Sequence, residues 1–165
     1  MYTIISGTNR SNSHTEKVAS IYQTILKQNG IEAEIFSLKD IDVLKRNEHF
    51  SQIEKGFLIP ADKFILIIPE YNGTFPGVLK AMIDISDVKK VWWGKKALLT
   101  GVSTGRAGNL RGMDQITGSL NHMKVIVHHN KLPLSSIDKI MDANGQLNAD
   151  TLHAIEDQIN EFINF

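Results

Sequence analysis

The sequence predicts an α/β fold in which helices cover both faces of a parallel, doubly wound sheet. Short apolar runs alternate with segments whose apolar residues recur at helical spacing, in the order βαβαβαβαβα. This rhythm is typical of parallel sheets. The run from Phe64 to Ile68 supports the same fold, because it is wholly apolar and rich in β-branched residues, as in a strand buried on both faces.

Five strands are expected, and Pro69 should end the third, because proline has no N–H to donate to a ladder. The expected strands are residues 2–6, 31–36, 64–68, 97–102 and 124–128. The first helix carries the stripe from Val18 to Leu26 and ends at Asn29-Gly30. Further helices are expected near residues 50–58, 76–84, 110–120 and 152–163, the last with Asn148 or Asp150 as its N-cap.

Length and composition are those of one globular domain, residues 1–165. The 18 basic and 18 acidic residues balance, which gives no electrostatic reason to expect nucleic acid or a membrane as a partner. The chain has no cysteine, so disulfides and thiolate chemistry are excluded and a cytoplasmic location is expected. We see no signal peptide and no apolar run of membrane-spanning length.

Three polar, glycine-bearing loops follow the first, third and fourth strands, so a parallel sheet brings them to one edge. The first, Gly7 to Thr15, is rich in hydroxyls, carries Arg10 and leads into a helix, whose free N–H groups favour a phosphate. A simple helix cap is the alternative. Neither a P-loop nor a dinucleotide-binding glycine motif occurs, which favours a single phosphate group over a pyrophosphate.

The second loop, Pro69 to Gly77, offers the flat face of Tyr71 for stacking and an amide at Asn72, while Gly73 allows a ligand to approach the backbone. A rigid turn before the next helix is the alternative. The third loop, Ser103 to Asn109, again presents small residues and hydroxyls before a helix. These loops predict a ligand site at the carboxyl edge of the sheet.

Together the three loops resemble the NADPH-dependent FMN reductase family, a branch of the flavodoxin-like fold. The family pattern G-S-x-R-x-x-S is matched by Gly7 to Ser13, where Thr8 keeps the hydroxyl of the usual serine. The string P-E-Y-N-x-S-x-P-G-x-L-K-N-x-I-D is matched, with small variations, by Pro69 to Asp84. The later S-x-G-x-x-G-G-x-R pattern resembles Ser103 to Arg111, with Asn109 in place of the second glycine. The resemblance covers roughly residues 1 to 125.

The resemblance implies a flavodoxin-like, five-stranded parallel sheet in the order 2-1-3-4-5 that binds FMN at its switch point. It implies that the FMN phosphate is held by Thr8, Arg10, Ser13, His14 and Thr15. It implies that the isoalloxazine is lined by Pro69, Glu70, Tyr71, Asn72 and Gly73. The pyrimidine side would be bordered by Ser103, Thr104, Gly105 and Arg106. Such proteins are usually homodimers or homotetramers.

The function we expect is an NAD(P)H-dependent flavin oxidoreductase with ping-pong kinetics. NAD(P)H would pass hydride to flavin N5, and the reduced flavin would reduce a small acceptor such as free flavin, a quinone or an azo compound. The cofactor carries the chemistry, so no side-chain acid or base is expected. A flavodoxin-type electron carrier is the alternative, but such carriers are strongly acidic and this chain is neutral. A flavodoxin-like interaction module without flavin is a third possibility.

Two further features receive simpler interpretations. His128 and His129 would face opposite ways on a strand, so we expect no metal site there. Lys89, Lys90, Lys95 and Lys96 are expected to form a solvated rim, with attraction of the NADPH phosphates as the alternative.

Overall fold

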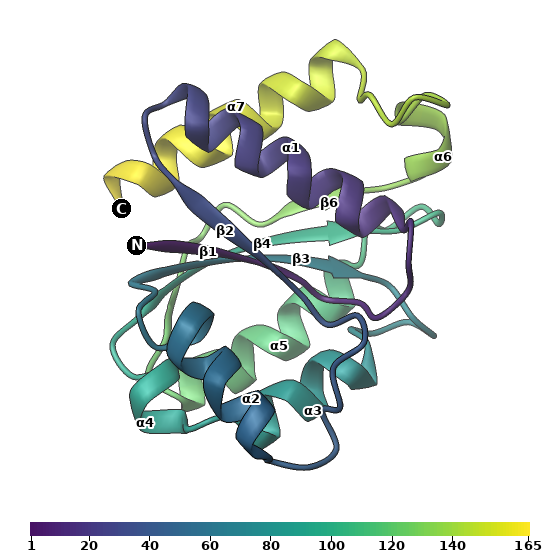
Figure 1. Cartoon of the computed structure of the whole chain (residues 1–165). Coiled ribbons are helices and arrows are strands. Elements are labelled where there is room, and N and C mark those ends of the chain that lie inside the picture. Colours follow the sequence, from purple (N-terminus) through teal and green to yellow (C-terminus); the bar gives the residue numbers. More distant parts are fainter.

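A computed structural model describes residues 1–165 and contains one six-stranded sheet in which every pair of neighbouring strands is parallel (Figure 1). The order β2-β1-β3-β4-β5 confirms the predicted one, and β6 pairs with β4 outside that path. The strands are β1 (Tyr2–Ser6), β2 (Ala33–Ser37), β3 (Lys63–Pro69), β4 (Lys96–Val102), β5 (Ile126–Val127) and β6 (Leu132–Leu134).

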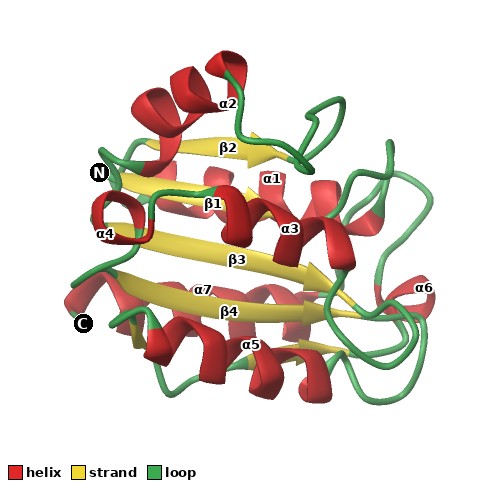
Figure 2. Cartoon of the chain, turned by 90° about the horizontal axis from the view of Figure 1, so that it is seen from below, coloured by secondary structure: helices red, strands yellow, loops and turns green.

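Helices cover both faces of the sheet, as Figures 1 and 2 show. One face carries α1 (His14–Gln28), α6 (Ile137–Ile140) and α7 (Ala149–Asn164). The other carries α2 (Glu48–Ile53), the π-helical turn η1 (Glu54–Leu58), α3 (Gly77–Ile85), α4 (Val88–Val91) and α5 (Leu110–His122). No helix combines the length and the apolar content that crossing a membrane requires.

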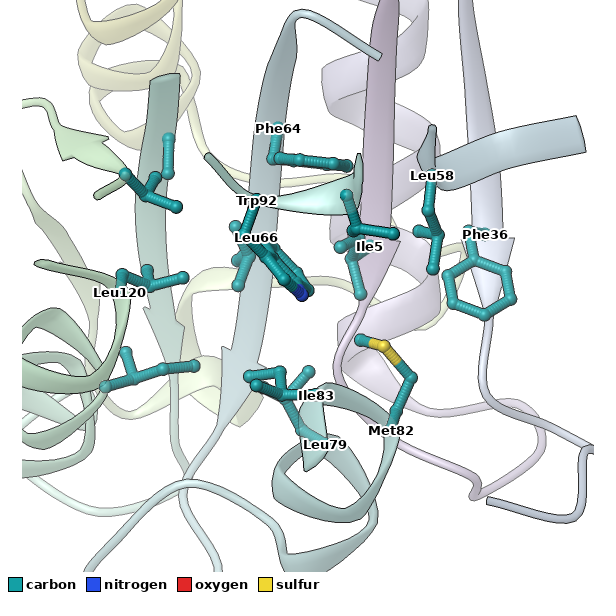
Figure 3. Packing of buried hydrophobic residues seen from close by; sticks show 14 of the residues in the cluster. Ile5, Phe36, Leu58, Phe64, Leu66, Leu79, Met82, Ile83, Trp92 and Leu120 are labelled. Atoms are coloured by element: carbon teal, nitrogen blue, oxygen red, sulfur yellow. The ribbon is translucent and has the colours of Figure 1, made fainter. Parts of the chain in front are cut away.

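The central strand β3 divides its side chains between two apolar cores. Phe64 and Leu66 (Figure 3), together with Ile68, pack against the helices from α2 to α5, whereas Ile65 and Ile67 pack against α1 and α7. All five side chains are fully buried. The alternation confirms a strand covered on both faces and makes β3 the fixed support from which the second loop leaves the sheet.

A buried polar cluster ties the two helices of one face to β4. The hydroxyl of Tyr22 in α1 lies 2.7 Å from Thr100 Oγ1 and 2.5 Å from Gln158 Oε1, while Gln158 Nε2 donates to Leu99 O at 3.1 Å. Burial raises the pKa of Tyr22, so its phenol stays neutral. This network sets the position of α1, whose first residues reach the candidate site.

The caps agree with the sequence, but the last strand does not. Gly30 takes a φ of +73° after α1, and Asn148 rather than Asp150 caps α7 through the Thr151 N–H. The strand expected over 124–128 is reduced to the two residues of β5, because Lys124 is left-handed and Ile126 lies at an exposed edge. Parallel pairing with the carboxyl half of β4 passes instead to β6.

Candidate functional site

A cavity of about 290 Å³ opens at the carboxyl edge of the sheet, where the three polar loops meet α6. Figure 2 shows these loops gathered beyond the arrowheads of the strands. Nine of the predicted residues line the cavity: Arg10, Ser13, His14, Thr15, Pro69, Glu70, Tyr71, Ser103 and Thr104. Four residues that the prediction did not include complete the wall: Ser11, Asn12, Val102 and Ile137.

The first loop delivers the start of α1 to the cavity. Ser13 is the N-cap, and its Oγ accepts the Glu16 N–H at 3.2 Å, so the capping role left open above is real. Two donors remain besides this cap, because the N–H groups of His14 and Thr15 have no acceptor within the helix. These free donors carry positive partial charge and suit an anion.

Arg10, Thr8 and Tyr71 form one unit that joins the first two loops. Thr8 is fully buried, and its Oγ1 lies 2.5 Å from the Tyr71 hydroxyl and accepts the Arg10 N–H at 3.1 Å. The Arg10 guanidinium lies 4.0 Å from the centre of the Tyr71 ring and forms no ion pair with a carboxylate. Thr8 does not line the cavity and instead positions the Tyr71 hydroxyl, whereas Arg10 keeps an uncompensated charge at the cavity.

His14 is directed toward the segment that contains α6. Its Nε2 lies 2.9 Å from Asp138 Oδ1, and its Nδ1 lies 3.3 Å from Met141 Sδ. The side chain thus reaches the cavity with both ring nitrogens already engaged. The sequence offered one pattern that could have identified this wall: Ser135-Ser136 directly follows the apolar strand β6, as polar residues follow β1 and β4.

The second loop is a tight hairpin at its tip. The Tyr71 N–H donates to Thr74 O at 2.9 Å, and the Thr74 N–H donates back to Tyr71 O at 3.2 Å. Asn72 and Gly73 both have positive φ, +52° and +80°, which is the type I′ geometry that Asn-Gly favours. The glycine thus serves the turn, and neither residue lies on the cavity wall.

Glu70 is the one carboxylate on the cavity wall, and it is directed toward the third loop. Its Oε2 accepts the Asn109 N–H at 3.2 Å, while the Asn109 side chain donates to Ile68 O at 3.1 Å and to Pro69 O at 3.0 Å. Asn109, at φ +61°, therefore ties the end of β3 to the start of α5. The carboxylate is engaged by this contact.

The third loop is held by β6 and the residues after it. The Ser103 N–H donates to Leu134 O, the Ile137 N–H donates to Ser103 O, and the Ser136 N–H donates to Gly105 O, all within 3.0 Å. Ser103 and Thr104 thus lie on the cavity wall, whereas Gly105 and Arg106 are exposed and lie off it.

Two other regions do not contribute to the site. A larger cavity of about 490 Å³ lies between α1, α7 and residues 144–147, and none of the predicted residues lines it. Lys95 and Lys96 lie at the opposite, amino edge of the sheet, where their amino groups donate to main-chain oxygen atoms. The expectation of a solvated rim is therefore wrong for Lys95 and Lys96, whereas Lys89 and Lys90 are exposed as expected.

Comparison with known proteins defines the class. The family model for NADPH-dependent FMN reductase matches residues 2–138. The chain belongs to the NADPH-dependent FMN reductase family, whose members are oxidoreductases, with FMN as cofactor and NADPH as the electron donor.

Two curated relatives of the chain are named as reductases. The chain is 26% identical over 105 residues to a 2-hydroxy-1,4-benzoquinone reductase from a Burkholderia species, a match that covers 59% of this chain and 57% of the relative. The matched region therefore spans little more than half of that reductase. The chain is 30% identical over 138 residues to an FMN-dependent NADPH-azoreductase from Staphylococcus aureus, covering 75% of this chain and 67% of the azoreductase.

Solved structures confirm the flavodoxin-like fold. A flavoenzyme NAD(P)H:(acceptor) oxidoreductase from Paracoccus denitrificans superposes with a TM-score of 0.79 at 20% identity, covering 99% of this chain and 94% of that one. An archaeal flavodoxin superposes with a TM-score of 0.60 at 12% identity, covering 98% of each chain. Because enzymes and flavodoxins share this fold, the choice between them depends on the site and on the family.

The residues around the cavity fit FMN. A phosphate monoester needs donors and positive charge, which the start of α1, the Ser13 hydroxyl and Arg10 supply on one side of the cavity. The flavin ring needs a wall without opposing negative charge, and the single carboxylate there is held by the Asn109 N–H. The donor set therefore suits the cofactor of the family.

Proposed function

We propose that this chain is an FMN-dependent oxidoreductase that takes hydride from NAD(P)H and reduces a small acceptor by a ping-pong mechanism. The proposed acceptor is free flavin, a quinone or an azo compound. One observation carries the proposal: the free N–H groups of α1, the unpaired cation of Arg10 and three hydroxyl-bearing loops converge on a single cavity. Bound FMN would supply the redox chemistry by accepting hydride at N5.

The chain's own residues would bind and orient. We propose that Arg10, Ser13 and the His14 and Thr15 N–H groups hold the phosphate, and that Thr8 acts by fixing Tyr71. Pro69, Glu70 and Tyr71 would flank one side of the flavin ring, with Ser103 and Thr104 at the other. Asp138 would fix the orientation of the His14 ring beside the phosphate. No side chain is assigned a proton transfer.

The alternative is an electron carrier of the flavodoxin type, because that fold is shared. Two observations favour the enzyme: the family match, and a formal net charge of +0, which offers no acidic surface for docking to a basic redox partner. The reducing cytoplasm is the proposed location, and a homodimer or homotetramer is the proposed assembly.

The test is the visible absorbance of the purified protein with added FMN, before and after anaerobic NADPH. Flavin bands that bleach within seconds and return when a quinone is added would support the enzyme. Bands that persist in the presence of both NADPH and NADH would support the carrier. If no flavin stays bound, FMN-dependent oxidation of NADPH in steady state separates an exchanging flavin substrate from a protein that does not use flavin.

A further inference from the structure

Two histidines lie together on the side of the molecule away from the cavity. Because β5 ends at Val127, His128 and His129 belong to the turn that follows it rather than to a strand. Their rings lie 4.4 Å apart between centroids, with 36° between their planes. The expectation that they face opposite ways is therefore wrong, and the reason is the early end of β5.

A carboxylate from α7 completes the group. One ligand atom each from His128, His129 and Glu161 can be chosen so that all three lie within 4.8 Å of one another. Asn130 links the members, since its N–H donates to His128 Nδ1 at 3.3 Å and its side chain donates to Glu161 Oε2 at 2.8 Å. The cluster thus joins the turn after β5 to the last helix.

One of the three side chains is fixed by burial, and the other two are exposed and can move to bind a metal. His128 is only 2% exposed, and its ring packs edge-on against Phe162 and Phe165 with centroids 5.8 and 4.8 Å away. His129 and Glu161 are exposed and can adjust. A metal ion placed centrally would lie no more than about 2.8 Å from each of the three ligand atoms. Ligand distances in zinc sites are about 2.0–2.2 Å, so small rotations of the two exposed side chains would bring the ligands into range.

We propose that His128, His129 and Glu161 bind one divalent transition-metal ion, of which Zn²⁺ is the reference case, with water completing the coordination. Two imidazoles and one carboxylate are the donor set that such ions prefer, whereas Mg²⁺ and Ca²⁺ prefer oxygen alone. The site lies beside Lys96 and Ala97 at the amino end of β4, whereas the cavity is beyond Val102. The inference is thus independent of the proposed function.

Metal binding at this site would stabilise the fold. β5 pairs with β4 through two residues, and the turn that follows is held by the His128 N–H bond to Ala97 O and by the Gln158 Nε2 bond from α7 to Asn130 O. A metal bound across this turn and α7 would stabilise the folded chain, because unfolding separates Glu161 from the adjacent His128 and His129 and leaves a weaker site. The fold should therefore be more resistant to heat with the metal than without it.

The experiment uses the full chain without a histidine tag, stripped of metal with EDTA. Zinc is titrated by calorimetry, and the thermal midpoint is measured with zinc and again after excess EDTA. We expect one equivalent to bind, the midpoint to rise, and EDTA to reverse the rise. Cobalt in place of zinc should give the visible bands of a nitrogen- and oxygen-ligated ion.

Matched variants locate the site. His129→Gln and Glu161→Gln each remove one ligand at an exposed position. The glutamine at position 161 can still accept the hydrogen bond from Asn130. Each variant should bind zinc at least tenfold more weakly. His153→Gln is the control, because His153 is exposed on the same helix beside Glu156 and Asp157 but has no second imidazole. The proposal is overturned if the unmodified chain binds no zinc, if His129→Gln binds as tightly, or if His153→Gln abolishes binding.

Discussion

Positively charged side chains have acceptors within the protein at one edge of the sheet and lack them at the other. At the amino edge, Lys63 Nζ donates to Phe162 O at 2.8 Å and to Ile163 O at 3.0 Å, at the carboxyl end of α7. At the carboxyl edge, Arg10 has no carboxylate partner and the first N–H groups of α1 have no acceptor within the helix. Charges that satisfy the protein's own helix ends stabilise the fold, whereas charges and donors left unsatisfied at a cavity are available to a ligand.

Removing the unpaired cation should have the largest effect on ligand binding. In Arg10→Ala, FMN loses one charge-assisted contact worth about 1.5–3 kcal/mol, so its dissociation constant should rise roughly ten- to hundredfold. The unfolding free energy should change little, because the Arg10 side chain is exposed and rests on the face of Tyr71, while its backbone bond to Thr8 is kept in alanine. Flavin fluorescence titration measures the first quantity and urea unfolding the second. Unchanged FMN affinity would remove Arg10 from the site.

Removing a cation at the amino edge should give the reverse pattern. Lys63→Met keeps most of the apolar stem but leaves two carbonyls at the end of α7 without their donor, so the unfolding free energy should fall by about 1–2 kcal/mol. FMN affinity should stay within experimental error. Urea unfolding and the same fluorescence titration test both statements. A variant as stable as the parent but weakened toward FMN would contradict the division between the edges.

Much of the fold followed from local patterns. The apolar run of β3 and the stripe of α1 are confirmed because each pattern has one simple structural reading. The strand β6 was missed because Pro133 stands at its centre, and proline is disfavoured in a strand. That proline is tolerated because β6 pairs with β4 alone, which leaves the other side of the strand without a partner.

The sequence predicted which residues gather at the cavity more fully than how they are arranged there. The family motifs placed nine residues that the structure brings to one cavity. They did not separate Asn72 and Gly73, whose positive φ angles serve a turn, from their neighbours on the wall. The contacts of Asp138 and Met141 with His14 also could not be predicted, because they depend on where α6 lies relative to the first residue of α1, more than a hundred residues away in the chain.

Ser13 sharpens the comparison, because it caps α1 and is also one of the proposed phosphate-binding residues. Ser13→Ala removes the N-cap of α1, which should cost about 1 kcal/mol of unfolding free energy and also weaken FMN binding. Ser13→Asp is the matched variant: aspartate caps as well as serine, so stability should return, while its carboxylate should repel the FMN phosphate. Recovery of both properties in Ser13→Asp would mean that Ser13 is only a cap.

The smallest effect is expected for NADPH use when a lysine of the amino edge is neutralised. Lys96 and Val102 begin and end β4, so the Lys96 backbone lies on the order of 20 Å from the cavity edge, about twice the distance over which physiological salt screens charge. Lys96→Met removes a bond from Nζ to Phe165 O but should leave the KM for NADPH unchanged within about twofold. Steady-state NADPH oxidation well below the unfolding temperature measures this. A KM raised severalfold would show that NADPH meets the amino edge during turnover, and the functional division between the two edges would then fail.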